Sequence, residues 1–169
     1  MLSIDRLDAA LLRMLAQDAR RGVVELSVTL GVSRNTVQSR LRRLEEAGVL
    51  AAYRAEIDLA QAGAPVQAFL ALEIQQEMLG DIIDHLTANP QVLEAHATTG
   101  REDLLVRVAA PSQAGLQDQI QQIVAIRGVV HSTTTLALTT PLPYRAMPFI
   151  EYITRETGWG RSTPGASDE

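Results

Sequence analysis

The chain has 169 residues, which is room for two small domains, and 46% of them are hydrophobic, which excludes disorder over most of its length. It contains no run of about 18 apolar residues and no basic, apolar leader at its start, so neither a membrane-spanning helix nor a signal peptide is predicted. Cysteine is absent, which excludes disulfides and cysteine-bound zinc and agrees with a cytoplasmic location.

The charge of the chain is unevenly distributed. The net charge is -5, yet residues 1–64 hold nine arginines against eight acids, whereas residues 65–169 hold six arginines against twelve acids. Residues 34–43 contain four arginines and no acid. A local basic segment on an acidic protein can attract nucleic acid, while the remaining charge limits non-specific adhesion.

The first predicted element is a helix over residues 5–17. Asp5 can cap this helix, and Asp8, three residues later, lies near the positive end of the helix dipole. We expect the helix to pack across the two that follow it and to complete a three-helix core. Its apolar face is formed by Leu7, Leu11, Leu12 and Leu15.

Residues 23–44 predict two short helices joined by a tight turn. Residues 25–30 form the first helix, and Gly31 supplies the turn because glycine takes a positive φ at little cost. Ser33 can cap the second helix by accepting a backbone N–H. This is the layout of a helix-turn-helix, whose second helix enters the DNA major groove. The buried stripe of that second helix is formed by Val37, Leu41 and Leu44.

Polar side chains on the outer side of the second helix are the candidate DNA contacts, because arginine and amide groups match base edges and arginine also binds phosphate. Arg40 is either one more such contact or a structural residue bonded within the domain. The alternative for the whole segment is a helical hairpin with a solvated arginine face. The predicted DNA-binding residues are Ser33, Arg34, Asn35, Thr36, Gln38, Ser39, Arg42 and Arg43. Contacts to base edges are expected from Arg34, Asn35, Gln38 and Ser39, and contacts to phosphate from Arg42 and Arg43.

A connecting segment follows this helix. Gly48 is expected just past the end of the helix. Residues 49–57 form an extended segment, which is either the strand of a wing or an arm that leads to the next domain. Residues 58–65 contain Gly63 and Pro65 and form the predicted linker, so that the first domain spans residues 1–57.

From residue 66 the hydrophobic period changes from helical to alternating. The order βαββαβ is that of the ferredoxin-like unit, in which two helices cover one face of a four-stranded antiparallel sheet. The predicted fold class is therefore α+β, with an N-terminal winged helix-turn-helix and a C-terminal ferredoxin-like domain over residues 66–140. Strands are predicted at 66–74, 92–98, 103–109 and 129–138, and helices around 79–86 and 116–124.

The second face of this sheet is predicted to be partly apolar, which favours dimerisation through the sheet. The alternative is that the C-terminal segment, residues 141–169, folds back and covers this face. Within that segment a short helix is expected over residues 147–157, and residues 158–169 are expected to be disordered. The residues predicted to project from the open face include Phe69, Ala71, Leu93, Ala95 and Ala97.

Over residues 4–140 the chain resembles the Lrp/AsnC family of bacterial and archaeal transcription regulators. The N-terminal resemblance rests on residues 7–8, 18–20, 25–27, 31–33, Val37, 40–45 and 48–50. In the second half it rests on Val92, on Thr99-Gly100 followed by Asp103-Leu104-Leu105, and on residues 128–130.

The resemblance implies a double-stranded DNA partner, dimers that assemble into larger rings, often octamers, and a small-molecule effector, commonly an amino acid. The effector site of such proteins corresponds here to Thr99, Gly100 and Asp103, with Thr133 and Thr135 as further candidates. Leu104, in place of the commoner aromatic residue, and the charged pair before Asp103 leave the identity of the effector open. The alternative is a plain hairpin turn, in which Gly100 provides φ and Asp103 bonds locally.

No catalytic, metal or cofactor site is predicted. The three histidines, His85, His96 and His131, lie on separate elements without metal-ligand spacing. Two alternatives to a sequence-specific regulator remain: an architectural DNA-binding protein, and an enzyme like the siroheme decarboxylases, some of which resemble this family. The net negative charge argues against the first alternative, and the basic helix argues against the second.

Overall fold

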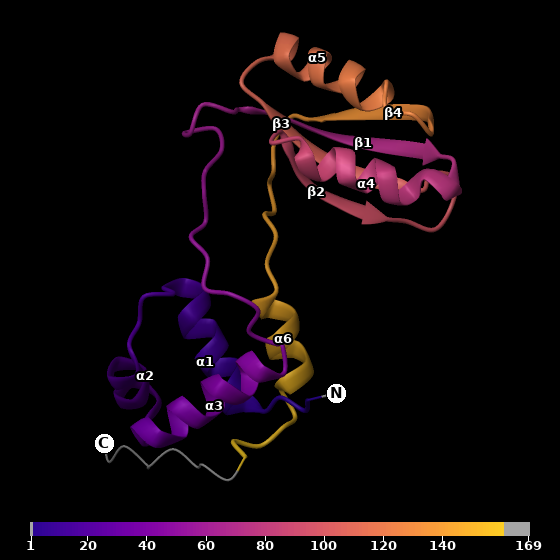
Figure 1. The fold of residues 1–169 in the computed structure, drawn as a ribbon. Helices are drawn as coiled ribbons and strands as arrows, with labels where there is room; N and C mark the ends of the chain where they lie inside the picture. Colours follow the sequence, from indigo (N-terminus) through magenta and orange to yellow (C-terminus); the bar gives the residue numbers. More distant parts are fainter. Residues whose placement is uncertain (1, 161–169) are drawn as a thin grey trace. The chain divides into compact units, whose positions relative to one another are not determined.

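A computed structural model describes residues 2–160 and divides the chain into two compact units (Figure 1). The first, which we name the helical unit, combines the residues up to Glu56 with those from Pro143 onward. The second, which we name the sheet unit, spans Ile57–Leu142. Among the described residues, no helix has both the length and the apolar character needed to cross a membrane.

The helical unit begins with α1, Arg6–Gln17. The Asp5 side chain accepts the backbone N–H of Asp8 at 3.0 Å, and the Asp8 side chain accepts the backbone N–H of Asp5 at 3.0 Å. This reciprocal capping box satisfies two backbone donors that the helix start would otherwise leave free, and it confirms the predicted cap.

Helices α2 (Val23–Leu30) and α3 (Arg34–Glu46) follow, with Gly31 between them at φ 64°. The Ser33 hydroxyl accepts the backbone N–H of Thr36 at 3.1 Å and so caps α3, as predicted. The three helices enclose one core, which confirms the predicted apolar stripes. The buried members of that core are Leu7, Leu11, Met14, Leu15, Leu26 and Val37.

The segment after α3 is an arm and not a wing. Gly48 ends the helix at φ 68°, as predicted, but no strand forms over residues 49–57. A wing strand needs a second strand to pair with, and the described part of the helical unit provides none. The winged part of the predicted fold is therefore wrong. The arm is instead fixed to α3, since the Tyr53 hydroxyl donates to Glu45 Oε1 at 2.8 Å.

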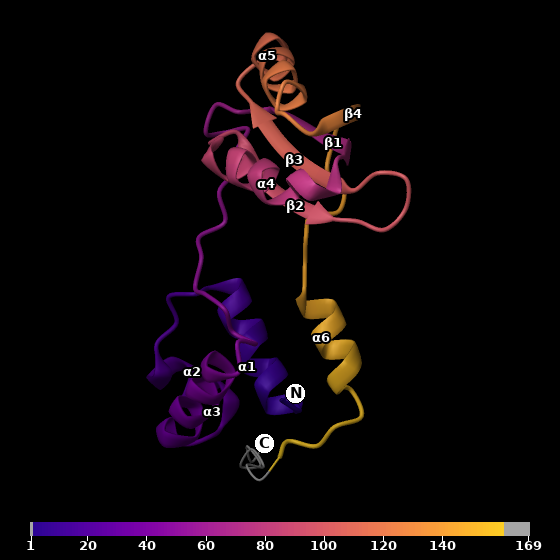
Figure 2. The same cartoon turned by 45° about the vertical axis from the view of Figure 1, so that its right-hand side comes forward.

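The C-terminal segment belongs to the helical unit, where α6 (Met147–Thr154) packs on α1 (Figures 1 and 2). It therefore does not cover the sheet, as one of the sequence-based alternatives proposed. The least exposed residues of α6 recur at helical spacing along one side of the helix, and Thr154 is only 2% exposed. The members of this side are Met147, Ile150 and Thr154, and Thr157, just past the helix, continues the same side.

The described end of the chain, residues 158–160, is ordered, contrary to the prediction of disorder. The backbone N–H of Arg6 donates to the carbonyl of Gly158 at 3.2 Å, and Trp159 packs against the core of the helical unit. The hydrogen bond and the packing of Trp159 supply the stabilising contacts that a small, polar tail does not form within itself. The rest of the predicted disordered segment, residues 161–169, lies outside the described residues.

The sheet unit is the predicted ferredoxin-like fold. Its four strands are all antiparallel in the order β2-β3-β1-β4, and the two longer helices cover one face (Figure 1). Leu70, Leu72 and Val106 are completely buried between the sheet and these helices. The elements are β1 (Val66–Ile74), η1 (Gln76–Met78), α4 (Leu79–Ala88), β2 (Val92–Ala97), β3 (Leu104–Ala110), α5 (Gln113–Val124) and β4 (Val129–Ala137).

The open face of the sheet differs in part from the prediction. Phe69 and Ala71 lie on it, as expected, because they alternate with the buried Leu70 and Leu72. A register shift between Val92 and Glu94 moves the rest of β2 by one residue. The register pairs Ala95 with the buried Val106 and Ala97 with the buried Leu104, so these alanines belong to the other face. Glu94 and His96 take their place on the open face.

Candidate functional site

The outer surface of α3 carries five of the predicted DNA contacts on one continuous arc. At 100° per residue, Arg34 and Ser39 mark the ends of an arc of about 140° that faces away from the core. Arg34 and Arg42 form no ion pair with another described residue, so their guanidinium groups are available to a ligand. The exposed members of the arc are Arg34, Asn35, Gln38, Ser39 and Arg42.

Two further predicted contacts lie at the N-terminus of α3. The hydroxyls of Ser33 and Thr36 are 2.9 Å apart and share a hydrogen bond, while Ser33 also caps the helix. These groups therefore have a structural role already. Their position at the positive end of a 13-residue helix also suits an anionic ligand.

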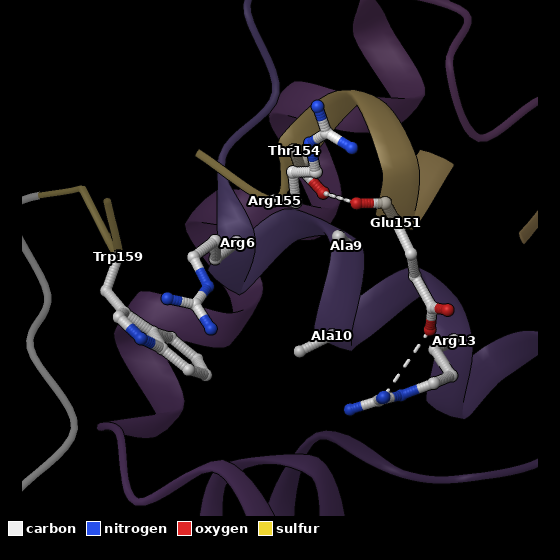
Figure 3. Close-up of a pocket in the computed structure, with 8 residues that line it drawn as sticks. All are labelled: Arg6, Ala9, Ala10, Arg13, Glu151, Thr154, Arg155 and Trp159. Carbon is white, nitrogen blue, oxygen red and sulfur yellow. Dashed lines mark hydrogen bonds and ion pairs between the residues drawn. The ribbon is translucent and has the colours of Figure 1, made fainter. Parts of the chain in front are cut away.

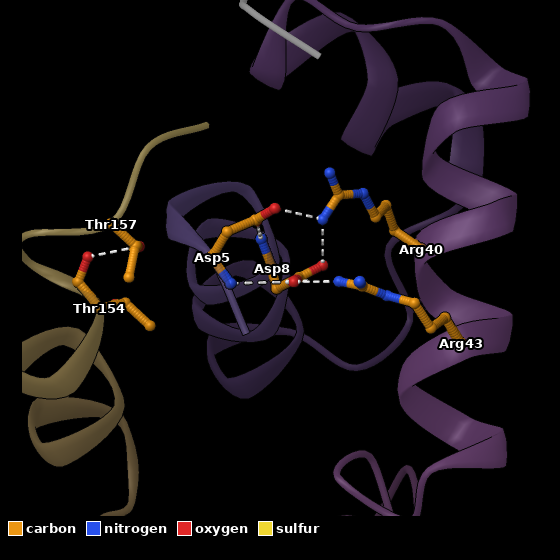
Figure 4. Close-up of polar contacts among 6 residues, drawn as sticks. All are labelled: Asp5, Asp8, Arg40, Arg43, Thr154 and Thr157. Carbon is orange, nitrogen blue, oxygen red and sulfur yellow. Dashed lines mark hydrogen bonds and ion pairs between the residues drawn. The ribbon is translucent and has the colours of Figure 1, made fainter. Parts of the chain in front are cut away.

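An ion-pair cluster fixes the inner side of α3 to α1 (Figure 4). Arg40 Nη1 lies 2.5 Å from Asp5 Oδ2 and 3.1 Å from Asp8 Oδ1. Arg43 Nη2 binds Asp8 Oδ2, and Asp8 is completely buried. Of the two roles considered for Arg40, the structure supports the structural one, because its side chain is 13% exposed and bonded within the unit.

Arg43 lies differently from the prediction, which placed it outward beside Arg42. It follows Arg40 by three residues and therefore lies on the same side of the helix, toward α1. Its side chain remains 39% exposed, so its predicted phosphate contact stays a prediction. Asp8 is the acid within an otherwise apolar stretch, residues 7–12, and such an acid indicates a buried ion pair.

The cluster favours the charged forms of Asp5 and Arg40. Burial acts to raise the pKa of the Asp5 carboxyl, but hydrogen bonds from the Asp8 backbone and from Arg40 outweigh it, so this pKa lies below its ordinary value of 3.8. Burial likewise acts to lower the pKa of Arg40, and its bonds to Asp5 and Asp8 raise it overall. Asp5 and Arg40 are therefore both charged near neutral pH.

The predicted effector turn lies between β2 and β3, and its aspartate is hydrogen-bonded to residues at and just after the end of β1. Asp103 Oδ2 accepts the backbone N–H of Ile74 at 2.8 Å, and Oδ1 accepts the Gln76 side-chain amide at 2.5 Å. Thr99 and Gly100 are exposed, and Gly100 adopts φ 130°, which favours glycine. The hairpin alternative predicted local bonding of Asp103, whereas its two side-chain partners lie at and just after the end of β1. Each carboxylate oxygen can still accept a second bond.

The other two predicted effector residues lie elsewhere on the same sheet. Thr133 pairs with Ala71 and Thr135 pairs with Phe69, so both lie on the open face at the outer strand β4. Strand β1 separates them from the turn, whose Asp103 N–H donates to the carbonyl of Leu72 in β1. Within one chain the structure therefore does not bring the two groups together.

Two pockets lie elsewhere. One, of about 270 Å³, lies between α1 and α6 (Figure 3), and the other, of about 410 Å³, lies at the ends of α4 and α5. None of the predicted effector residues lines either of them. The first pocket is lined by Arg6, Ala9, Ala10, Arg13, Glu151, Thr154, Arg155 and Trp159.

The described residues contain no group of three histidine, aspartate or glutamate side chains arranged to hold a metal ion. His85 Nδ1 lies 2.7 Å from the carbonyl of Asp81, which occupies that nitrogen within its own helix. His96 lies 3.7 Å from Glu94 on the open face of the sheet.

Comparison with known proteins agrees with this arrangement. Residues 4–45 match the AsnC-type helix-turn-helix domain, and residues 67–147 match the Lrp/AsnC ligand binding domain. The transcriptional regulator LrpA of Mycobacterium tuberculosis is 32% identical over 139 residues, which cover 82% of this chain and 92% of LrpA.

Solved structures share both units. The structure of E. coli AsnC superposes with a TM-score of 0.80 at 27% identity and covers 87% of this chain and 100% of its own. A transcriptional regulator from Neisseria meningitidis in complex with L-Met has the same fold, with a TM-score of 0.77 at 24% identity over 83% of this chain and 94% of its own. With the helix-turn-helix and the ferredoxin-like sheet both matched, the chain belongs to the Lrp/AsnC family of DNA-binding transcriptional regulators.

Proposed function

We propose that this protein is a sequence-specific transcription regulator whose helix α3 enters the major groove. One observation carries the proposal: the outer arc of α3 presents Arg34 and Arg42 without ion-pair partners among the described residues, on a protein of net charge -5. Arg34, together with the amide and hydroxyl groups of the arc, reads base edges, and Arg42 binds phosphate. Interspersed amides on the arc favour base reading over purely electrostatic binding, which distinguishes the proposal from an architectural role.

Ser33, Thr36 and Arg43 complete the proposed DNA contacts at the margins of the arc. The two hydroxyls and the positive end of α3 approach one phosphate. The exposed part of Arg43 approaches another, while its Nη2 remains bonded to Asp8. A phosphate contact changes affinity and its salt dependence more than it changes sequence preference.

We further propose that two chains dimerise through the open faces of their sheets. Phe69, Ala71 and Leu105 form a half-buried apolar centre there, beside Arg107, which donates to Gln67 at 2.7 and 3.2 Å. An isologous dimer presents two α3 helices and therefore reads an operator with two-fold symmetry.

The proposed effector is a free amino acid. Backbone N–H groups around Gly100 would bind its carboxylate, and the remaining acceptor positions of Asp103 would bind its ammonium group. Thr133 and Thr135 would contribute from another chain of the assembly, since β1 separates β4 from this turn within one chain. The complex of the Neisseria regulator with L-Met, which has the same fold, supports this class of effector.

The test is fluorescence anisotropy with a labelled duplex from upstream of the protein's own gene, with and without a panel of amino acids. Arg34→Ala should weaken binding to this duplex by about 1–3 kcal/mol, with less effect on a scrambled duplex. Arg127→Ala, which removes an exposed arginine from the sheet unit, is the charge-matched control and should bind normally. Equal affinity of the wild-type protein for the natural and scrambled duplexes at one salt concentration would contradict sequence-specific binding.

A further inference from the structure

Residues 147–160, which we name the C-terminal strap, run across the helical unit after the chain has left the sheet unit. The match to the ligand binding domain ends at residue 147, and the match to the helix-turn-helix ends at residue 45. The strap is thus a feature of this chain that neither matched domain describes. It makes three separate contacts.

The first contact covers a second side of α1. The side of α1 that faces α2 and α3 holds large apolar residues, yet Ala9, Ala10 and Leu12 are also no more than 9% exposed. A helix that is apolar on nearly all sides is buried between neighbours. Here α6 is the neighbour, with Thr154 at 2% exposure and Glu151 paired to Arg13 at 3.4 Å (Figure 3).

The second contact anchors the strap to the core. Trp159 packs against the core of the helical unit, and the guanidinium carbon of Arg6 lies 5.8 Å from the centre of the indole ring. The hydrogen bond from the Arg6 backbone to the Gly158 carbonyl fixes the residue before the indole. The strap therefore reaches the start of α1, where the capping box and the ion-pair cluster lie.

The third contact bears on the ion pair that holds α3. A Cβ atom on Gly160 would lie 2.5 Å from Arg40 Nη2 and 2.5 Å from Asp5 Oδ2. Gly160 also adopts φ +67°, where a side chain is strained. The backbone of the strap thus lies directly against the Arg40–Asp5 pair, with no room for a side chain.

We propose that the C-terminal strap positions the recognition helix: by clamping α1 and the Arg40–Asp5 pair, it fixes the orientation in which α3 presents its outer arc. This inference rests on the proposed function, since it concerns DNA binding through α3. The strap itself contributes no DNA contact. Residues 138–146 connect the strap to β4. This connection is a second covalent link between the two units, in addition to the arm and linker.

Gly160→Ala and its matched control Gly158→Ala test the third contact in the full chain. Gly158 has no positive φ and only an ordinary contact at 3.9 Å, so its replacement should leave DNA affinity unchanged. Gly160→Ala should weaken binding roughly 5- to 30-fold, the equilibrium factor that corresponds to a left-handed non-glycine residue. The probe is the duplex that the wild-type protein binds.

Trp159→Ala and Trp159→Phe test the anchor. The alanine variant should lose affinity at least as strongly as Gly160→Ala, and the phenylalanine variant should largely restore it because an aromatic ring remains beside Arg6. Stoichiometric titration counts the active fraction of each preparation. A strap that served stability alone would lower that fraction without changing the dissociation constant of the active molecules, and this result would overturn the inference.

A readout without DNA separates this inference from the proposed function. Trp159 is the single tryptophan of the chain, so its emission reports directly on the strap. We expect blue-shifted emission, protected from acrylamide, in the wild-type protein and in Gly158→Ala, and red-shifted, quenchable emission in Gly160→Ala. Exposed indole emission in the wild-type protein would refute strap docking. If the wild-type protein shows a docked indole but binds no duplex, the proposed function fails, and positioning of α3 fails with it.

Discussion

The buried carboxylate of Asp8 is the residue on which the geometry of α3 depends. It accepts a backbone N–H at the start of α1 and binds both Arg40 and Arg43 of α3. A charge with no solvent exposure is stable only while its partners remain, so the three residues act as one group. Conversely, each arginine depends on the acid.

Asp8→Asn should destabilise the helical unit by about 3–5 kcal/mol. The nearly buried Arg40 would keep Asp5 as a charged partner but would face a neutral amide in place of the Asp8 carboxylate. The matched control is Glu25→Gln, which removes an exposed partner of Arg21 and should cost well under 1 kcal/mol. Urea unfolding followed by Trp159 emission measures both. Equal midpoints for the two variants would show that the cluster contributes little.

Tyr53 provides a pH-dependent contact between the arm and α3. Burial, together with the hydrogen bond to Glu45 and the negative charge of that residue, raises the pKa of Tyr53 to about 12. Because the pKa is raised in the folded state, the contact is fully present below the ordinary value near 10 and is lost as pH rises through about 12. Absorbance titration should show that Tyr53→Phe removes a phenol that ionises near pH 12. By contrast, Tyr144→Phe, at a side chain 93% exposed, should leave that transition in place.

Residue roles could be predicted from sequence where they depend on local spacing. The outer arc of α3 follows from 100° steps along a helix, and the same arithmetic would have placed Arg43 beside Arg40 on the inner side. The partner of both arginines could not be found in this way, because Asp8 lies more than thirty residues away and only the packing of α1 against α3 brings it there. The bonds of Asp103 could not be found in this way either, since Ile74 and Gln76 lie 29 and 27 residues away in the chain.

Helices and strands begin and end where local chemistry dictates, and this is why most of them could be predicted. Asp5 and Ser33 are side-chain caps, and Gly31 and Gly48 provide the left-handed conformations that end α2 and α3. Two features escaped prediction for physical reasons. The bulge in β2 breaks the alternation on which face assignments depend. An eight-residue helix such as α6 has an apolar side that could pack on either unit, and only the all-round burial of α1 decides between them.

The Ser33 cap of α3 can be tested for its effects on stability and on phosphate binding. Ser33→Ala leaves the backbone N–H of Thr36 without its acceptor and should cost about 1 kcal/mol of stability. Ser33→Asp restores a capping oxygen and should recover that stability, but its negative charge should oppose an approaching phosphate. Thermal unfolding and anisotropy together separate the two effects. Normal DNA affinity of Ser33→Asp would argue that no phosphate approaches this end of α3.

The molecule as a whole is acidic and places its basic surface on one helix of one unit. Its α+β class and the topology of its sheet were predicted from the sequence, because the hydrophobic period changes clearly at residue 66. Its family was predicted separately, from the resemblance of its motifs to those of the Lrp/AsnC regulators. Assembly is harder to predict, since it depends on a face whose composition the bulge in β2 alters. The apolar centre of that face nevertheless survives on β1 and β3.

Phe69→Glu should convert the proposed dimer into monomers, because it places a charge at the apolar centre of the open face. Light scattering after size-exclusion chromatography measures the mass, and loss of the dimer should also lower operator affinity because two half-sites are no longer bound together. Val124→Glu, on the solvent side of α5, is the control and should leave the mass unchanged. A Phe69→Glu protein of unchanged mass would place the dimer interface elsewhere.

Because the helical unit is built from two segments that flank the sheet unit, biosynthesis imposes an order on its completion. A ribosome delivers α1 to α3 first and the strap only after β4 has been translated. A nascent chain therefore contains a complete sheet unit before its helical unit is finished. Translation products that stop ahead of Met147 carry the whole sheet but no clamp, and, if the strap acts as proposed, they do not compete with full-length molecules for operators.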